Sequence, residues 1–277
     1  MLRGYLRTLP GVLLVGLCGV SSALAQTAPN LQSEAPYGVV SSTFTNSNTA
    51  PQTIINGDVC YTTPPVTAPV TITGATVTPC PVATGTDQGN SLAFVNSQPC
   101  TSLGVGPVAL DSAVVGGNPP GTFTPGCYSS GGAMSITLSS TVTLNGAGVY
   151  IFRSGGALTT GANSLVTVAG GACASDVFWA PVGATTLGAN AAATPTPTFV
   201  GTILDAAGIT LGHFAHLEGR ALAFGGTVTS DANTITVPTC TTAAPVPTLP
   251  GAALFGLMLL LGLAGVLAIR SRPARAV

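Results

Sequence analysis

Charge is scarce in this chain of 277 residues, which contains no lysine and only seven arginines. Five of these arginines lie within the first seven or the last eight residues. Residues 26–249 therefore keep two arginines against eight acidic residues, a net charge of about −6. Proteins that bind the phosphate backbone of nucleic acid need a basic surface, so the composition excludes nucleic acid as a partner.

The motifs of common enzymes and cofactor sites are also missing. The chain has no Gly-x-Ser-x-Gly, no phosphate-binding loop, no dinucleotide fingerprint before a helix and no Cys-x-x-Cys spacing. His213, His216 and Glu218 are the only cluster of ligand-like side chains, and we interpret them as corner or surface residues. Asp176 and Asp205 could pair as in a glycosidase, but aspartate at a corner between strands is the commoner role. We therefore expect no enzyme activity, no cofactor and no metal.

The N-terminus has the pattern of a secretory signal peptide. Arg3 and Arg7 precede an apolar run from Val12 to Val20, and the small residues Ser22-Ala-Leu-Ala25 follow. This order of basic, apolar and small residues predicts a signal peptide over residues 1–25 that is cut after Ala25. An uncleaved anchor is the alternative, but the apolar run is short for that role.

The C-terminus combines a short motif, an apolar segment and a basic tail. Ala252 to Ile269 is an 18-residue stretch without charge, and Arg270, Arg272 and Arg275 follow it. This stretch predicts a transmembrane helix with a cytoplasmic basic tail over residues 250–277.

The residues just before this helix, Val246, Pro247, Thr248 and Leu249, complete a three-part tail. The tail resembles the Ile-Pro-Thr-Leu sorting signals of Gram-negative surface proteins, although Pro250-Gly-Ala252 replaces their usual polar and aromatic residues. The resemblance implies a linker and sorting motif over residues 241–249 that an exosortase-type protease processes. A plain membrane anchor is the alternative. Either way, we expect an exported protein at the cell surface or secreted, anchored to the membrane transiently or permanently.

Cysteine usage agrees with export. One of the seven cysteines, Cys18, lies in the predicted signal peptide, and six remain. An even number in an exported chain indicates three disulfides, for which 15 connectivities exist. The pairs we expect are Cys60–Cys80, Cys100–Cys127 and Cys173–Cys240.

An internal repeat occupies the middle of the chain. Four eight-residue stretches can be laid over one another: Ala157–Ser164, Ala184–Ala191, Gly208–Ala215 and Thr227–Thr234. A fifth, weaker copy begins at Ser135. Irregular spacing of this length, about 19 to 27 residues, is typical of a solenoid. The third position of each copy is threonine: Thr137, Thr159, Thr186, Thr210 and Thr229.

Each copy lies between two further strand-like segments. Val149–Phe152 and Val177–Trp179 are examples of the apolar strand that precedes a copy, and Leu165–Val168 is an example of the short strand that follows one. Three short strands per coil, with Gly and Asn at the corners, predict a β-solenoid of triangular section. In Ile209-Thr210-Leu211 the aliphatic residues share one face, so the five threonines are expected to point outward from the same side.

Two segments complete the predicted domain, which covers residues 26–240. Tyr37–Val59 is expected to form the first coil. Asp87–Gln98 lacks strict alternation and begins with a residue that suits a helix N-cap, so it predicts a helix beside the solenoid.

The chain resembles the microbial ice-binding protein family over roughly Ala35 to Pro238. The strongest matches are Pro125–Tyr128, Gly148–Phe152, Asp176–Trp179, Phe199–Leu204 and Gly219–Ala223 through Thr234–Thr236. The resemblance implies a mainly β fold, a discontinuous right-handed β-solenoid of triangular section with one α-helix alongside. It also implies that C-terminal strands complete the first coil and that one flat face adsorbs to an ice crystal surface.

The expected function is therefore that of an exported ice-binding protein, acting as an antifreeze or an inhibitor of ice recrystallisation. Five threonine methyls at about 0.8 kcal/mol each would give about 4 kcal/mol, which is near millimolar affinity. A second row is therefore needed, from Thr160 and Thr227 or from Thr143, Thr167 and Thr236. The alternative function is a surface adhesin or matrix protein that binds polysaccharide or itself.

Overall fold

The structure is a computed structural model that describes residues 26–47, 50–65 and 70–239. The predicted signal peptide, Cys240, the sorting motif Val246–Leu249 and the predicted transmembrane segment lie outside these residues. Within the described ranges, no helix is both long and apolar enough to span a membrane.

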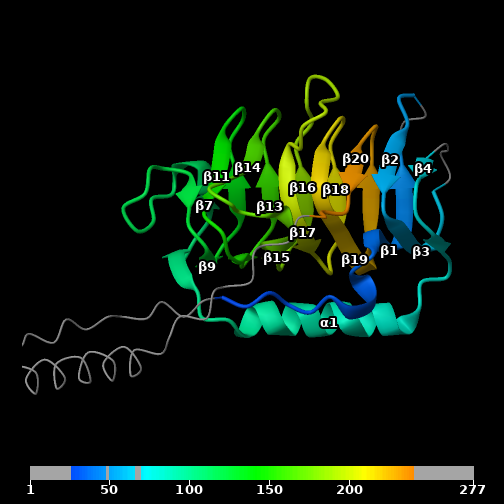
Figure 1. The fold of residues 1–277 in the computed structure, drawn as a ribbon, viewed down its shortest axis with the longest axis horizontal. Helices are drawn as coiled ribbons and strands as arrows, with labels where there is room; N and C mark the ends of the chain where they lie inside the picture. Colours follow the sequence, from blue (N-terminus) through cyan, green and yellow to red (C-terminus); the bar gives the residue numbers. More distant parts are fainter. Residues whose placement is uncertain (1–25, 48–49, 66–69, 240–277) are drawn as a thin grey trace, which may run out of the picture.

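The described residues form twenty strands that stack in parallel along one axis, and these strands make three sides around a common interior (Figure 1). The helix side holds β6 (Thr101–Gly104), β9 (Gly126–Ser130), β12 (Tyr150–Ser154), β15 (Val177–Pro181), β17 (Phe199–Leu204), the middle of β19 (His216–Ser230), the first part of β1 (Tyr37–Asn46), β3 (Asp58–Thr63) and β5 (Thr76–Val77).

The two other sides are built in the same way. The threonine side holds β7 (Val108–Ala109), β10 (Met134–Ile136), β13 (Leu158–Thr160), β16 (Thr185–Leu187), β18 (Ile209–Leu211) and the ends of β19 and β1. The third side holds β8 (Thr122–Phe123), β11 (Thr141–Asn145), β14 (Leu165–Ala169), the starts of β17 and β19, β20 (Thr234–Thr236), β2 (Thr53–Asn56) and β4 (Val70–Ile72).

The stack does not follow the order of the sequence. The N-terminal strand β1 lies between β19 and β3, and β2 lies between β20 and β4. The first coil begins at Tyr37 and contains β1 and β2. It therefore lies next to the C-terminal strands β19 and β20. The prediction of a mainly β, discontinuous solenoid with one α-helix alongside is confirmed for the part of the chain that the structure describes.

An aromatic stack fills the interior at one end. Tyr128, Phe152 and Trp179 occupy equivalent positions on successive strands of the helix side. The rings of Phe152 and Trp179 are stacked with centroids 4.3 Å apart, and Phe199 lies 4.9 Å from Trp179. Trp179 is buried, so it supports the core and offers no platform for a sugar.

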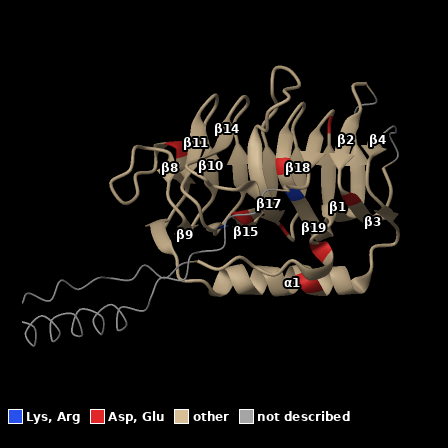
Figure 2. Ribbon diagram, viewed as in Figure 1, with Lys and Arg blue, Asp and Glu red and all other residues tan. Residues whose placement is uncertain are grey.

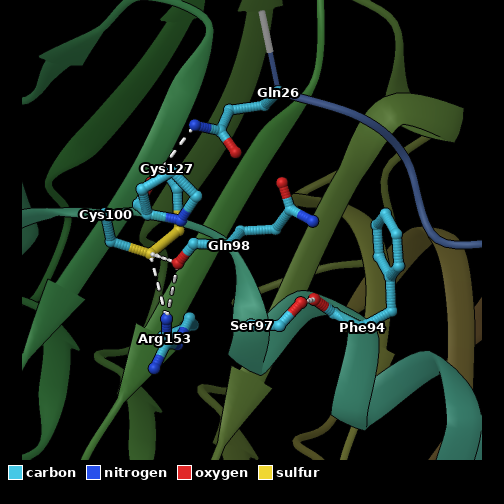
Figure 3. Close-up of a disulfide and its surroundings, with 8 residues drawn as sticks. Gln26, Phe94, Ser97, Gln98, Cys100, Cys127 and Arg153 are labelled. Carbon is cyan, nitrogen blue, oxygen red and sulfur yellow. Dashed lines mark hydrogen bonds between the residues drawn. A yellow bond between two sulfur atoms is a disulfide. The ribbon is translucent and has the colours of Figure 1, made fainter. Parts of the chain in front are cut away.

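The helix α1 (Val82–Ser97) lies along the helix side, roughly parallel to the axis of the stack (Figure 1). A disulfide holds each of its ends: Cys60 on β3 bonds to Cys80, and Cys100 bonds to Cys127 on β9. Figure 3 shows the second disulfide beside Arg153, whose Nη1 donates a hydrogen bond of 2.9 Å to the carbonyl of Gln98. These are two of the three pairs expected from the sequence. Cys173 is also disulfide-bonded, and its expected partner lies outside the described residues.

The predicted start of this helix, at Asp87, was wrong by five residues, because the helix begins at Val82 after Pro81. Asp87 lies inside the helix, where its carboxylate accepts hydrogen bonds from the backbone and the hydroxyl of Ser33. It therefore fixes the N-terminal segment to the helix instead of capping the helix N-terminus.

Candidate functional site

One row of side chains runs along the threonine side, across six strands. The strand registers place six residues opposite one another in the order Ser135, Thr159, Thr186, Thr210, Thr229 and Thr45. Thr159, Thr186 and Thr210 are exposed, while the other three are half-buried. We call these six residues the first row.

The first row points outward because its chain neighbours point inward. Leu158, Ile209 and Val228 each precede a row threonine, and all three are at most 1 % exposed. Successive side chains of a strand alternate between its two faces, so the threonines must face outward. Rungs of a parallel sheet lie about 4.7–4.9 Å apart, which sets the repeat of the row.

Four of the five threonines predicted for this ladder share the row, and Thr137 does not. Thr137 follows β10, where its hydroxyl donates a 2.7 Å hydrogen bond to Asp111. Ser135 takes the expected place, opposite Thr159. The triplets Met134-Ser-Ile136 and Ile136-Thr-Leu138 both alternate, but Leu138 is 67 % exposed, so only the first triplet has an inward face.

The two candidates for a second row on the same strands differ in their placement. Thr160 pairs with Ile136, which is buried, and its hydroxyl accepts a 2.8 Å hydrogen bond from the backbone N–H of Gly188. Thr160 therefore supports the corner, and its assignment to an outward row was wrong. Thr227, by contrast, is exposed and pairs with Thr43 on β1.

Thr45 belongs to the first row, although the internal repeat does not include it. Its hydroxyl donates a 2.8 Å hydrogen bond to the hydroxyl of Thr229, although the two residues are 184 positions apart. The segment around it matches no copy of the repeat over eight residues. The triplet Thr43-Phe-Thr45 has the same alternation as Thr227-Val-Thr229, and this is the sequence pattern that indicates an outward position for Thr45.

The threonine side carries little charge, and Figure 2 shows only scattered Asp, Glu and Arg residues over the strands. No member of the first row is ionisable. Asp205 is completely buried at the corner before β18, where it accepts hydrogen bonds from the hydroxyl of Thr185 at 2.7 Å and from the N–H of Ala207 at 2.7 Å. Burial raises the pKa of the Asp205 carboxyl. Its role is thus to hold the corner that leads into Thr210.

The two histidines also lie at corners. The ring of His213 contacts Asp231, with Nδ1 and Oδ1 3.0 Å apart, and Nδ1 of His216 lies 3.0 Å from the carbonyl oxygen of Thr194. Among the described residues, no three His, Cys, Asp or Glu side chains form a group that could hold a metal ion.

The third side carries threonines as well, but its outward row is interrupted. Thr143 and Thr167 pair directly, and Thr236 pairs with Glu218. Glu218 thus places a carboxylate in the row, and Val200, which pairs with Glu218, is buried. The first row is the longer uninterrupted series of hydroxyl-bearing residues.

The fold and this site together define a three-sided parallel β-solenoid with one uncharged, periodic, hydroxyl-bearing side. The sequence model of the ice-binding-like family matches residues 39–236, so the chain belongs to this family.

Two ice-binding proteins are similar in sequence. The one from Flavobacterium frigoris (strain PS1) is 35 % identical over 129 residues, which are 47 % of this chain and 43 % of that protein. The one from Nostoc sp. (strain HG1) is 30 % identical over 220 residues, which are 77 % of this chain and 68 % of that protein. The match thus spans less than half the length of the Flavobacterium relative.

Solved structures agree with the fold. An ice-binding protein from an Antarctic biological consortium superposes with a TM-score of 0.65 at 26 % identity, over 78 % of this chain and 93 % of that one. An ice-binding protein from the Antarctic ascomycete Antarctomyces psychrotrophicus gives a TM-score of 0.63 at 25 % identity, over 77 % of this chain and all of that one.

Proposed function

We propose that the protein adsorbs to ice through the threonine side of its solenoid. The observation that carries the proposal is the register of the first row, which places five threonines and one serine opposite one another on neighbouring strands. Membership of the ice-binding-like family supports the choice of ice as the partner.

The chemistry of the row suits an ice surface. Each threonine offers a methyl group that orders water around it and a hydroxyl group that can join the ordered water. Hydrogen bonds between neighbouring coils keep these groups at a fixed spacing, so the protein does not lose much conformational freedom on adsorption. The interior under the row is closely packed, because Ile136, Leu158, Leu187, Ile209 and Leu211 are each at most 2 % exposed.

Thermal hysteresis and ice-recrystallisation assays on residues 26–240 test the proposal. We expect activity in the wild-type fragment and a large loss in Thr210→Tyr, because a ring on an exposed row position holds its neighbours away from a flat surface. Thr143→Tyr on the third side is the matched control and should leave the activity unchanged. An inactive but folded wild-type fragment would overturn the proposal.

We further propose that the protein is exported and that its C-terminal tail anchors it to the membrane before an exosortase-type protease removes the tail. The support is the sequence pattern at the two ends. Mass spectrometry of the protein from its native host tests both steps. The mature N-terminus should be Gln26, and the released form should lack the apolar segment from Ala252 to Ile269. A surface protein that keeps this segment would leave the plain membrane anchor as the explanation.

A further inference from the structure

A second line of positions runs beside the first row, and its composition changes along the stack. Two residues before Ser135, Thr159, Thr186 and Thr210 the chain has only small residues: Ala133, Ala157, Ala184 and Gly208. Two residues before Thr229 and Thr45 it has Thr227 and Thr43. The second line therefore changes from alanine or glycine to threonine where the C-terminal strand β19 pairs with the N-terminal strand β1.

Strand pairing extends this second row by one further strand. Thr43 pairs with Thr227 on β19 and with Thr63 on β3. Thr227 and Thr63 are exposed, and Thr43 is half-buried. We call Thr227, Thr43 and Thr63 the second row. Together with Thr229 and Thr45, it forms a patch that is two rows wide.

The patch has a repeat in two directions. Along a strand, residues i and i+2 lie about 6.6–6.8 Å apart, and across strands the spacing is about 4.7–4.9 Å. The hydrogen bond of 2.8 Å between the hydroxyls of Thr45 and Thr229 ties the two strands together within the patch. Elsewhere on the threonine side, the hydroxyl groups repeat in one direction only.

The helix α1 contributes to this arrangement through Gln88. The register between β1 and β19 shifts between Ser41 and Thr43, so β19 has extra residues there. The Gln88 side chain pairs with the backbone at this shift: it donates a 2.7 Å hydrogen bond to the carbonyl of Leu222 and accepts a 2.7 Å hydrogen bond from the N–H of Phe224. The shift is thus held in place, and it brings Thr227 opposite Thr43.

We propose that the second row, Thr227, Thr43 and Thr63, determines which plane of the ice crystal the protein recognises. A single row of hydroxyls matches any plane that contains one suitable repeat, whereas a grid must match two repeats at once. This inference rests on the proposed adsorption through the threonine side, and it assigns a separate role to strands β1 and β3, which lie outside the internal repeat.

The test compares two triple variants of the full exported chain, labelled with a fluorophore, on a single ice crystal. One variant changes the second row to alanine (Thr43→Ala, Thr63→Ala and Thr227→Ala). The matched control changes three members of the first row to alanine (Thr159→Ala, Thr186→Ala and Thr210→Ala). Alanine removes the hydroxyl and the γ-methyl together, so the second-row variant loses one of the two repeats of the grid. Each fully buried methyl corresponds to about a fourfold change in affinity, so the loss of three methyls should weaken binding up to about 60-fold.

The two variants should differ in the planes that they stain. We expect the second-row variant to stain a broader or different set of planes than the wild type, and the first-row variant to stain the wild-type planes more weakly. Circular dichroism verifies the fold, and Thr63→Ala alone, at the exposed end of β3, repeats the test with the least change to the stack. A folded second-row variant that stains the wild-type planes overturns this inference alone, whereas a wild-type protein that stains no plane overturns the proposed function as well.

Discussion

Glu34 makes the stability of this protein depend on pH in an unusual direction. It lies in the short 3-10 helix Gln32–Glu34, is completely buried, and receives one long hydrogen bond of 3.5 Å from the hydroxyl of Ser91. Burial raises the pKa of its carboxyl to about 8, and the negative charge of Asp87 adds to the effect. The hydrogen bond from Ser91 and the charge of Arg220 lower the pKa but do not compensate.

The sign of the effect follows from the two states of the carboxyl. In the unfolded chain the pKa of Glu34 is near 4.5, and in the native chain it is about 8. Between pH 4.5 and pH 8 the Glu34 carboxyl of the native protein holds a proton that the unfolded chain has released. The contribution of protonated Glu34 to the free energy of unfolding is therefore complete below about pH 4.5 and is lost as the pH rises toward 8. At about 1.4 kcal/mol per pH unit, the free energy of unfolding should fall by up to about 3 kcal/mol between pH 5 and pH 7.

Urea unfolding of the wild type and of Glu34→Gln at several pH values measures this effect. The amide has nearly the shape of the protonated carboxyl and does not titrate, so the difference between the two proteins removes the contribution of all other groups. We expect Glu34→Gln to gain stability relative to the wild type by up to about 3 kcal/mol as the pH rises from 5 to 7. A difference that stays constant with pH, or that falls, would refute the reasoning.

Three further predictions concern the packing of the stack, and urea unfolding at pH 7 measures each of them. Gln88→Leu should cost about 1–3 kcal/mol, because it leaves the N–H of Phe224 without a partner and removes one of the two hydrogen bonds to the carbonyl of Leu222, which also accepts one from the N–H of Asp205. Asn90→Ala on the exposed face of α1 should cost less than about 0.5 kcal/mol. Trp179→Ala should cost about 3–5 kcal/mol, because it leaves a cavity between Phe152 and Phe199, and a loss below about 1 kcal/mol would contradict the stacked interior. Replacing both Cys60 and Cys80 by serine should cost about 3 kcal/mol by releasing a loop of 20 residues, and unchanged stability would mean that this disulfide does not hold α1.

The sequence predicted the alignment of the first row where the row is built from local repetition. Thr159, Thr186, Thr210 and Thr229 lie in copies of one pattern, and adjacent copies stack as neighbouring strands. The prediction that Thr137 belongs to the row was wrong, because two overlapping triplets alternate equally well in the sequence. Only the packing of the interior shows that Met134 and Ile136 are the inward residues.

The residues that the sequence did not predict depend on contacts between distant segments. Thr45 and Thr43 join the rows only because β1 lies beside β19, and the register shift that aligns them is not visible in either segment alone.

The start of the helix at Val82 could not be predicted from the sequence either. The buried residues of α1 are Thr84, Gln88, Ser91 and Val95, so the helix has no apolar stripe to predict its extent.

The central claim, that ice contacts the threonine side, is tested most directly by the uptake of protein into a slowly growing ice crystal. The measurement compares the wild-type residues 26–240 with Thr186→Tyr in the middle of the first row and with Thr143→Tyr on the third side. We predict that the crystal takes up the wild type and Thr143→Tyr equally and excludes most of Thr186→Tyr. Equal uptake of all three proteins, or exclusion of Thr143→Tyr alone, would contradict the account.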